Sequence, residues 1–368
     1  MILTHARPSS ALLHALALVS ALVLLAGCDA FGSDDEDDPD AAGSVLVANQ
    51  GNFGDANGSV TSYDPQTDEA SEAVPPSQLG SIIQGALADG GRYYAVANTA
   101  GRLNVYGSQT LDGLGQSRVL GSNPRYVAVA NGETAYVTNQ KFTAPSNVLL
   151  LDVADAGSIT VEDSVEVGYT PEDITLTEER AYTPLGGFSD TTLVAAIDRS
   201  GREVIENIQI DCYARFAFTD DEGEVLLPCN DAGDNGEVVV LDGESGNERA
   251  RISLPGAVTS IGATQAASYA PGSEELYVAL SENRIARLDT DGTGDDNERV
   301  ETLSISGSNP IGAVGYDAAA GELYVGRAAS AENPYTQSGS VTIHRRDGSQ
   351  VGRFDAGNAP AFLSFVEE

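Results

Sequence analysis

The sequence predicts an all-β chain that folds as a seven-bladed β-propeller, closed by pairing of its C-terminal strand with its N-terminal blade. Two observations lead to this prediction. A unit of short apolar runs, separated by glycine, asparagine and aspartate turns, recurs seven times. The chain also enters its first unit partway through and ends with the fragment that this first unit lacks.

The repeated unit is clearest between residues 121 and 154. A turn at Gly121-Ser-Asn-Pro124 precedes the run RYVAVA, a hairpin NGET, the run AYVTNQ, a loop and the run VLLLDVA. Apolar runs of this length between such turns are typical of antiparallel strands. The same order follows the Gly-x-x-Pro turns that begin at Gly168 and Gly307.

The second strand of each unit gives the repeat length. The copies lie 41 to 51 residues apart when they are aligned on Leu46, Ala95, Tyr136, Tyr182, Leu226, Tyr277 and Tyr324. A unit of this length with four short strands is typical of a propeller blade. We expect the tyrosines of this set to pack between blades.

The two ends of the repeat array complement each other. The first unit starts at its second strand, GSVLVANQ, without a preceding Gly-x-x-Pro strand. Gly357-Asn-Ala-Pro360 and the run AFLSF supply such a strand at the other end. We therefore expect this last strand to pair with the first blade, which would remove sheet edges that are open to further pairing. An open array with frayed ends is the alternative.

Residues 1–27 have the pattern of an export signal. Arg7 precedes a long apolar run, and Leu25-Ala26-Gly27-Cys28 resembles a bacterial lipobox, in which the cysteine becomes lipidated. The run is short for a membrane span and contains His14, so an anchoring helix is the weaker alternative. A secreted protein with a chance cysteine at this position is another.

We expect the lipid on Cys28 to hold the protein to the outer membrane, with residues 28–43 as a tether and 44–368 as the propeller. The tether contains DDEDDPD and is too charged to fold. It resembles the acidic signal that directs some lipoproteins of Bacteroidetes-like bacteria to the outer face of that membrane. We therefore expect display on the cell surface.

The charge of the chain excludes some partners. The formal net charge is −36, and Lys141 is the only lysine. Nucleic-acid binding needs a basic surface, which this composition does not provide. Such acidity is best tolerated where salt screens the repulsion, which favours a halophilic protein from a salt-rich habitat.

Cys212 and Cys229 form an even pair once Cys28 carries lipid. They flank two strand-like runs around the turn at 220–223, so they are expected to face each other on neighbouring strands. A disulfide is favoured in an exported protein. Two buried thiols are the alternative.

The residues that metal and nucleophilic chemistry require are scarce. Without the signal only His344 remains, which excludes a multi-histidine metal site and disfavours a Ser-His-Asp triad. We expect His344 on the surface of an outer strand. We expect the oxygen-rich string from Asp289 to Glu298 to form a solvated turn, and calcium binding is the alternative. Val300 occupies the twelfth position, where a calcium-binding loop needs a carboxylate ligand. We therefore expect no cofactor.

The motifs resemble a known family. AYVTNQ resembles the YVTN repeat of bacterial seven-bladed propellers, and VLVANQGNFG, GSNPRYVAVA and VGYTPED resemble a branch of Bacteroidetes-like surface lipoproteins, over about residues 44–366. That branch includes proteins that capture cobalamin and pass it to an outer-membrane transporter. The resemblance implies such a ligand and partner, although propellers host many unrelated functions.

The loops after the second strands are long and variable, so we expect the face that they form to bind the ligand. Aromatic faces beside amide and cationic donors suit a partly apolar ligand or a protein partner. The candidate residues, expected to be exposed, are Asn52, Phe53, Asn98, Arg125, Gln140, Lys141, Phe142, Tyr169, Phe188, Arg327 and Tyr335. For Asn98, as for Asn49 and Asn139, we expect local backbone hydrogen bonds that cap a strand end, and ligand contact is the alternative.

Together these patterns predict a cell-surface lipoprotein that binds a small ligand or a partner protein and has no catalytic residues. One alternative is a metal-assisted hydrolase of the lactonase type, which should gather three or four carboxylates in the central channel. Another is an adhesion or scaffold propeller, which should present a flat face.

Overall fold

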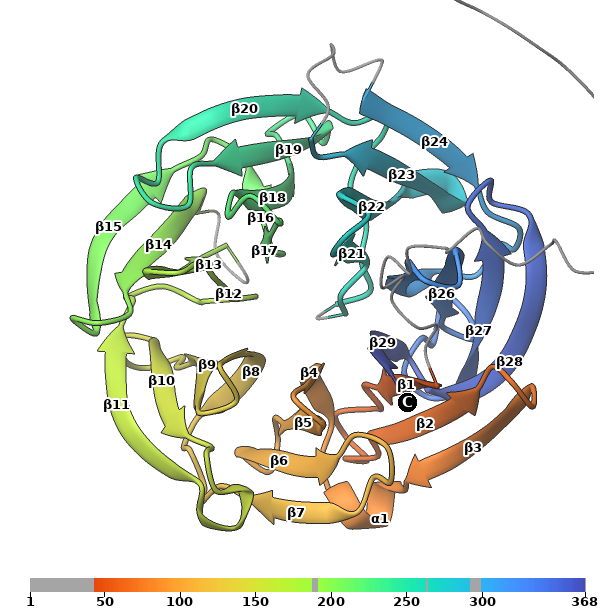
Figure 1. The fold of residues 1–368 in the computed structure, drawn as a ribbon, viewed down its shortest axis with the longest axis horizontal. Coiled ribbons are helices and arrows are strands. Elements are labelled where there is room, and N and C mark those ends of the chain that lie inside the picture. Colours follow the sequence, from red (N-terminus) through yellow and green to blue (C-terminus); the bar gives the residue numbers. More distant parts are fainter. Residues whose placement is uncertain (1–42, 187–190, 263, 292–298, 368) are drawn as a thin grey trace, which may run out of the picture. The chain divides into compact units, whose positions relative to one another are not determined.

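The computed structural model describes residues 43–186, 191–262, 264–291 and 299–367. Their strands form seven antiparallel sheets arranged as the blades of a β-propeller (Figure 1). The predicted signal peptide, Cys28 and Phe188 lie outside the described residues. In the described part of the chain, no helix has the length and apolar character that crossing a membrane requires.

Each blade has an innermost strand that faces the centre of the ring and an outermost strand at its periphery (Figure 1). From the centre outward, blade 1 contains β29 (Pro360–Val366), β1 (Ser44–Asn49), β2 (Ser59–Asp64) and β3 (Glu69–Val74). Blade 2 contains β4 (Ile83–Asp89), β5 (Arg92–Ala97), β6 (Arg102–Gly107) and β7 (Gly113–Gln116). Blade 3 contains β8 (Asn123–Ala130), β9 (Thr134–Gln140), β10 (Asn147–Asp152) and β11 (Thr160–Glu166).

Blades 4 and 5 have short innermost strands. Blade 4 contains β12 (Thr175–Leu176), β13 (Arg180–Pro184), β14 (Leu193–Asp198) and β15 (Glu203–Gln209). In blade 5 the innermost strand is split into β16 (Tyr213–Ala214) and β17 (Phe218–Thr219), which both pair with β18 (Val225–Asn230). The blade continues with β19 (Gly236–Leu241) and β20 (Glu248–Ser253).

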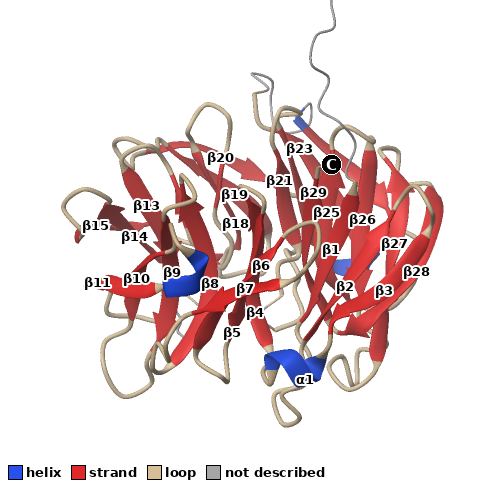
Figure 2. Ribbon diagram, turned by 60° about the horizontal axis from the view of Figure 1, so that its bottom comes forward, coloured by secondary structure: helices blue, strands red, loops and turns tan. Residues whose placement is uncertain are grey.

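Blades 6 and 7 complete the ring. Blade 6 contains β21 (Ala267–Ala270), β22 (Glu275–Leu280), β23 (Arg284–Asp289) and β24 (Val300–Ser304). Blade 7 contains β25 (Ile311–Asp317), β26 (Glu322–Arg327), β27 (Ser338–Arg345) and β28 (Gln350–Asn358). The described helices are single turns between strands (Figure 2): α1 (Pro76–Leu79), η1 (Ala156–Ser158) and η2 (Ser281–Asn283).

The last strand closes the first blade, as predicted. β29 pairs antiparallel with β1, so that Ala48 lies opposite Phe362 and Val47 lies opposite Leu363. Phe362 is buried and packs edge-on against Tyr126 of blade 3, with the ring centroids 5.8 Å apart. The prediction that both ends of the propeller share one blade is confirmed.

The seven positions that define the repeat all lie in the second strands of their blades. The four tyrosines among them, Tyr136, Tyr182, Tyr277 and Tyr324, are buried, which agrees with packing between sheets. His344 was predicted on the surface, and that prediction is wrong. Its side chain is fully buried on β27, and its ring nitrogens lie 3.0 Å from the Gly348 carbonyl oxygen and 2.9 Å from Thr342 Oγ1. These partners allow the imidazole to be buried, and the burial lowers its pKa.

Because successive strands alternate in direction, each blade has two distinct ends. The loops from second to third strands, and the segments that lead into the innermost strands, share one end, which we call the long-loop face. It includes the loops 50–58, 98–101, 141–146, 231–235, 281–283 and 328–337. The opposite end, where innermost strands turn back into second strands, is called the hairpin face.

Candidate functional site

Four of the predicted site residues are buried, and not exposed as the sequence led us to expect. Asn98, Arg125, Gln140 and Arg327 are each at most 4% exposed. Burial of a polar group is tolerated when internal partners replace water. The partners of these four residues divide them into two groups. Asn98 and Arg327 link neighbouring blades, whereas Arg125 and Gln140 lie beside the central channel.

Asn98 and Arg327 join neighbouring blades. Asn98 Nδ2 donates to the carbonyl oxygen of Pro124 in the next blade, at 2.8 Å. Arg327 Nη1 donates to the Asn309 carbonyl oxygen at 2.6 Å, and Nη2 donates to the Ser306 carbonyl oxygen at 2.9 Å. These two acceptors lie in the segment between blades 6 and 7, and Arg327 Nη1 also donates to Asn283 Oδ1 of η2 at 2.9 Å. These contacts explain the burial of both side chains without a ligand.

The asparagines at the ends of second strands do not make the local backbone caps that were expected. Asn49 Nδ2 donates to Ser59 Oγ at 3.2 Å and to Thr61 Oγ1 at 3.0 Å, across to β2. Asn139 Nδ2 donates to Asn147 Oδ1 at 2.9 Å, on β10. The expectation was wrong because these amides donate to acceptors on the third strand or in the next blade instead.

Arg125 and Gln140 belong to a polar cluster at the long-loop end of the central channel. Arg125 Nη2 lies 2.6 Å from Glu172 Oε2, and both side chains are buried. Gln140 accepts from Arg125 Nη1 at 3.4 Å and donates to the Pro171 carbonyl oxygen at 3.1 Å. The cluster therefore joins the innermost strand of blade 3 to the start of blade 4.

Arg215 is the second cation of this cluster, and it comes from the break between β16 and β17. Its Nη2 lies 3.8 Å from Glu172 Oε1, and its Nη1 donates to Ser260 Oγ at 3.3 Å. The side chain of Arg215 is 29% exposed, whereas that of Glu172 is fully buried. The side chain of Arg215 is thus partly open to solvent at the channel entrance.

Tyr335 reaches this entrance from the loop 328–337 of blade 7. Its hydroxyl packs directly against Gly262. Any larger residue at position 262 would clash, because its Cβ would lie 2.2 Å from Tyr335 Oη. Burial raises the pKa of Tyr335, and the positive charge of Arg215 acts in the opposite direction, which places the two groups within electrostatic reach. We call Arg125, Gln140, Glu172, Arg215, Ser260 and Tyr335 together the channel mouth.

The channel mouth is locally rich in positive charge. Two guanidinium groups contact one carboxylate, that of Glu172. The neighbouring carboxylate of Asp173 is buried, and this burial raises its pKa to about 7, so that it is only partly ionised near neutral pH. In a chain with a net charge of −36, this is an unusual place for surplus cationic donors.

Backbone geometry brings these charges to the centre. β12 contains only two residues, and Glu172 and Asp173 stand just before it, where the Asp173 amide donates to the Arg215 carbonyl oxygen at 3.3 Å. Gly85 of β4 allows β8 to approach closely, because a Cβ at Gly85 would lie 2.3 Å from the Arg125 carbonyl oxygen. The innermost strands can therefore converge tightly around the channel.

A cavity of about 390 Å³ occupies the channel toward the hairpin face. Its lining extends from Asp173 and Gln265 to Asp89 and Thr219, which are the last residues of β4 and β17. Asp173 is 5% exposed, and its Oδ2 accepts from the Ala217 amide at 3.2 Å and from Gln265 Nε2 at 3.5 Å. We call this space the channel cavity.

Aromatic side chains are exposed on the long-loop face. Phe53, Phe142 and Tyr169 are 68%, 73% and 48% exposed. The segments that carry Phe142 and Tyr169 meet at Ser146, whose Oγ accepts from the Lys141 amide at 3.1 Å and whose carbonyl oxygen accepts from the Val167 amide at 2.9 Å. Phe142 and Tyr169 thus stand on two connected loops.

Lys141 and Asn52 are not among the residues of the channel mouth. The Lys141 side chain is half-buried beside Gln140. Asn52 shapes its own loop, since its Nδ2 donates to Asp55 Oδ2 at 2.7 Å and its amide donates to Asn57 Oδ1 at 2.6 Å.

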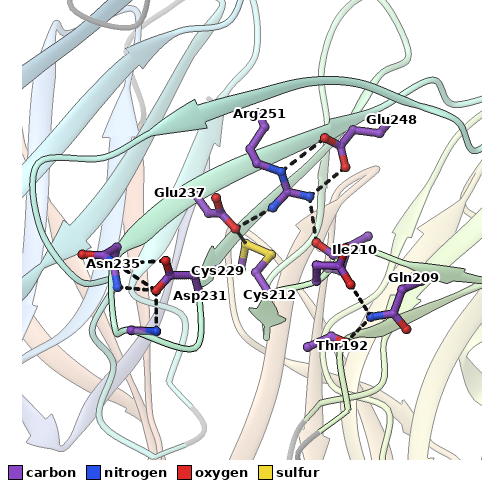
Figure 3. A network of polar contacts seen from close by, with 12 residues as sticks. Thr192, Gln209, Ile210, Cys212, Cys229, Asp231, Asn235, Glu237, Glu248 and Arg251 are labelled. Carbon is purple, nitrogen blue, oxygen red and sulfur yellow. Dashed lines mark hydrogen bonds and ion pairs between the residues drawn. A yellow bond between two sulfur atoms is a disulfide. The ribbon is translucent and has the colours of Figure 1, made fainter.

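A disulfide between Cys212 and Cys229 holds the segment that carries Arg215 (Figure 3). Cys212 immediately precedes β16, and Cys229 lies on β18. Beside the disulfide, Arg251 bridges Glu237 at 2.5 Å and Glu248 at 2.7 Å, and it also donates to the Ile210 carbonyl oxygen at 2.8 Å (Figure 3). These contacts anchor the chain on the N-terminal side of the break in the innermost strand of blade 5.

The described residues offer little for a metal. Cys212, Cys229 and Glu237 are close enough to share an ion, but the two sulfur atoms are bonded to each other. No group of three carboxylates in the described part of the chain meets the same distance requirement. Most of the acidic string considered for calcium, residues 292–298, lies outside the described residues.

Sequence reasoning missed Glu172, Asp173, Arg215, Ser260 and Gln265. The repeat contained a signal for Glu172, because it follows Pro171 of one Gly-x-x-Pro turn as Arg125 follows Pro124 of another. Equivalent positions of consecutive blades are neighbours around the ring. An arginine and a glutamate at these positions therefore predict a pair at the channel.

Comparison with known proteins supports the fold. No curated protein matches the chain significantly. Among solved structures, it is similar to a protein from Lactobacillus plantarum, with a TM-score of 0.63 and 15% identity over 89% of this chain and 100% of that one. It is also similar to Kuenenia stuttgartiensis hydrazine synthase, with a TM-score of 0.62 and 17% identity over 77% and 89% of the two chains.

A third similar structure is a dihydro-heme d1 dehydrogenase in complex with DHE, with a TM-score of 0.58 and 14% identity over 88% of this chain and 75% of that one. These neighbours share the propeller and differ in function, so they carry no activity to this chain. The family model described as "Domain of unknown function (DUF5074)" matches residues 43–358. Because this match spans most of the sequence, the chain belongs to the DUF5074 family.

Proposed function

We propose that this protein binds a small, partly apolar ligand at its long-loop face, with the channel mouth as the polar anchor. The observation that carries the proposal is the partly exposed side chain of Arg215. Its carboxylate partner, Glu172, is fully buried and lies closer to Arg125, at 2.6 Å against 3.8 Å. Arg215 therefore retains donors for an acceptor group of a ligand.

The surroundings of Arg215 suit such a ligand. Ser260 and Tyr335 add hydroxyl groups at the same entrance. Phe142 and Tyr169 offer exposed aromatic faces on the same end of the propeller. Sites that combine a few convergent polar groups with aromatic surface are typical of small-molecule binding.

The finer proposal concerns place and ligand. We propose a lipoprotein anchored through Cys28 to the outer membrane and displayed on the cell surface, where it captures a nutrient for an outer-membrane transporter. A cobalamin-like compound is the first candidate. The support is the resemblance of the VLVANQGNFG and GSNPRYVAVA motifs to surface lipoproteins, together with the lipobox and the acidic tether.

Two other functions fit the described residues less well. A metal-assisted hydrolase would need converging carboxylates, but Glu172 is held by arginines and no trio of carboxylates is close enough among the described residues. An adhesion propeller with a flat face would not need the cluster of partly exposed donors at the channel mouth.

Calorimetry and thermal shift at high salt test the proposal with cobalamin as the probe, because a ligand of the folded state raises the melting temperature. Arg215→Gln should weaken binding by about 10- to 100-fold, which corresponds to the loss of a hydrogen bond from a charged group. Arg353→Gln on the outer strand β28, where the side chain is 59% exposed, is the matched control and should bind as the wild type does.

A failure of cobalamin to bind would overturn the nutrient assignment. Repeating the thermal shift with other small molecules that carry acceptor groups then tests the site itself. If such a ligand binds equally to the Arg215→Gln variant, the channel mouth is not the anchor.

A further inference from the structure

The channel cavity lies apart from the channel mouth and has its own chemistry. Asp173 and Gln265 are its polar residues at the inner end, and Asp89 lies at the hairpin end. Its volume of about 390 Å³ falls within the range of small-molecule sites. The cavity is therefore large enough for a compact organic ligand.

The Asp173 carboxylate has acceptor capacity left toward this cavity. Its Oδ1 accepts from the Ile174 amide at 2.9 Å, and its Oδ2 accepts from Ala217 and Gln265. A carboxylate offers about four acceptor positions. The nearby guanidinium groups of Arg125 and Arg215 contact Glu172 instead. A buried carboxylate in this situation gains most from a ligand that brings both a charge and N–H donors.

The remaining lining of the channel cavity mixes apolar side chains with polar groups of the backbone and of Thr175, Thr219 and Ser364. Tyr126 and Phe362 form an edge-on aromatic pair, and Phe218 and Leu363 line the space between them and the hairpin face. Aromatic faces attract cations as well as alkyl groups. The cavity thus combines one buried anionic group with aromatic and aliphatic side chains in a lining that is about as polar as it is apolar.

We propose that the channel cavity binds a small organic ammonium ion, with its N–H groups on Asp173 and its alkyl body against Tyr126, Phe218 and Phe362. A primary ammonium supplies the positive charge and the donors that Asp173 lacks. Its alkyl chain removes apolar wall surface from water. This inference is independent of the ligand proposed for the long-loop face.

Binding should depend on pH. The negative charge of the neighbouring Glu172 raises the pKa of Asp173 further. Asp89 lies at the far end of the cavity, and Arg125 and Arg215 contact Glu172. Burial is the largest effect and raises the Asp173 pKa to about 7. The carboxylate form, which attracts an ammonium, therefore increases as the pH rises through this value.

Calorimetric titration with n-butylammonium and with 1-butanol, at constant ionic strength, tests the proposal. We expect saturable binding of n-butylammonium at about pH 8, and about tenfold weaker binding at about pH 6, because the competent ionised fraction falls by that factor. The neutral alcohol should bind at least about tenfold more weakly than the ammonium, since it brings no charge to the carboxylate.

Two variants locate the site. Asp173→Asn keeps an oxygen for the Ala217 amide but removes the charge, and it should weaken n-butylammonium binding at least about tenfold. Glu203→Gln removes one exposed charge from the outer strand β15, away from the cavity, and should leave the affinity within about twofold, which excludes general attraction to an acidic protein.

Three results would overturn the proposal: no saturable binding of n-butylammonium, equal binding of 1-butanol, or unchanged affinity in Asp173→Asn. If that variant does not fold, the wild-type protein decides the question. An affinity for n-butylammonium that is the same at about pH 6 and about pH 8 would then reject Asp173 as the acceptor.

Discussion

The guanidinium of Arg125 lies 2.6 Å from the carboxylate of Glu172, in a pair that is buried on both sides and joins blade 3 to blade 4. Ions in such a place are strongly dependent on each other, because neither can recover its hydration while the protein stays folded. The pair also supports Arg215, whose guanidinium faces the other oxygen of the same carboxylate.

Replacement of Glu172 should destabilise the propeller severely. In Glu172→Gln the buried charge of Arg125 loses its counter-ion, and we expect the free energy of unfolding to fall by about 3–5 kcal/mol. Guanidinium chloride unfolding measures this loss. Glu162→Gln, which breaks an exposed pair with Arg202 at 2.9 Å, should cost less than about 1 kcal/mol. Equal losses in the two variants would contradict the structural role of the buried pair.

Closure of the ring can be tested with two phenylalanines. Phe362→Ala removes a buried ring from the strand that completes blade 1, and we expect a loss of about 3–5 kcal/mol in the free energy of unfolding. Phe142→Ala, at a position that is 73% exposed, should change stability by no more than about 0.5 kcal/mol. Denaturant unfolding of both proteins gives the comparison, and a small effect of Phe362→Ala would argue against closure through β29.

The disulfide should contribute measurably to stability. Cys212 and Cys229 are separated by 17 positions, and a covalent loop of that size restricts the unfolded chain by about 3 kcal/mol. The Cys212→Ser, Cys229→Ser double variant should therefore unfold at a lower temperature than the oxidised wild type. Reductant should lower the melting temperature of the wild type toward that of the double variant and leave the variant unchanged. A reductant effect of equal size on both proteins would assign it to something other than this disulfide.

Asp173 should make the stability depend on pH. The folded protein keeps the proton of Asp173 up to about pH 7, whereas the ordinary value for this group is 3.8. The proton held by Asp173 therefore contributes fully to the free energy of unfolding below about pH 4. This contribution, on the order of 4 kcal/mol, is lost as the pH rises to about 7.

Unfolding of the wild type and Asp173→Asn at about pH 4 and about pH 8 isolates this contribution, because other groups titrate in both proteins. The variant should gain stability relative to the wild type as the pH rises. A difference between the two proteins that is independent of pH would show that Asp173 has an ordinary pKa in the fold.

The blades could be predicted from the sequence because their signals are local. Turns such as Gly121-Ser-Asn-Pro124 and the alternating apolar runs around Tyr136 lie within one unit, and their repetition gives the number of blades. Ring closure was also predictable, since the strand missing before Val45 stands at Pro360. Local patterns and the pairing of ends together determine the architecture.

The site was less predictable because burial in a ring depends on distant partners. Arginine is usually an exposed residue, so the sequence alone suggested that Arg125 is exposed. Its burial depends on the contact with Glu172 in the next blade. Arg215 gave no signal, because the break between β16 and β17 is not visible in the run ARFAFT. His344 was misplaced for a similar reason, since its acceptors became apparent only in three dimensions.

The pairing of Ser44 with Val366 also has a consequence for biosynthesis. Blades 2 to 7 can each assemble from residues that leave the ribosome close together in time, whereas blade 1 must wait for the final strand. Contacts between such distant positions form slowly. During that interval β1 exposes an unsatisfied edge, so newly made chains should be most vulnerable to mispairing with one another until β29 has left the ribosome.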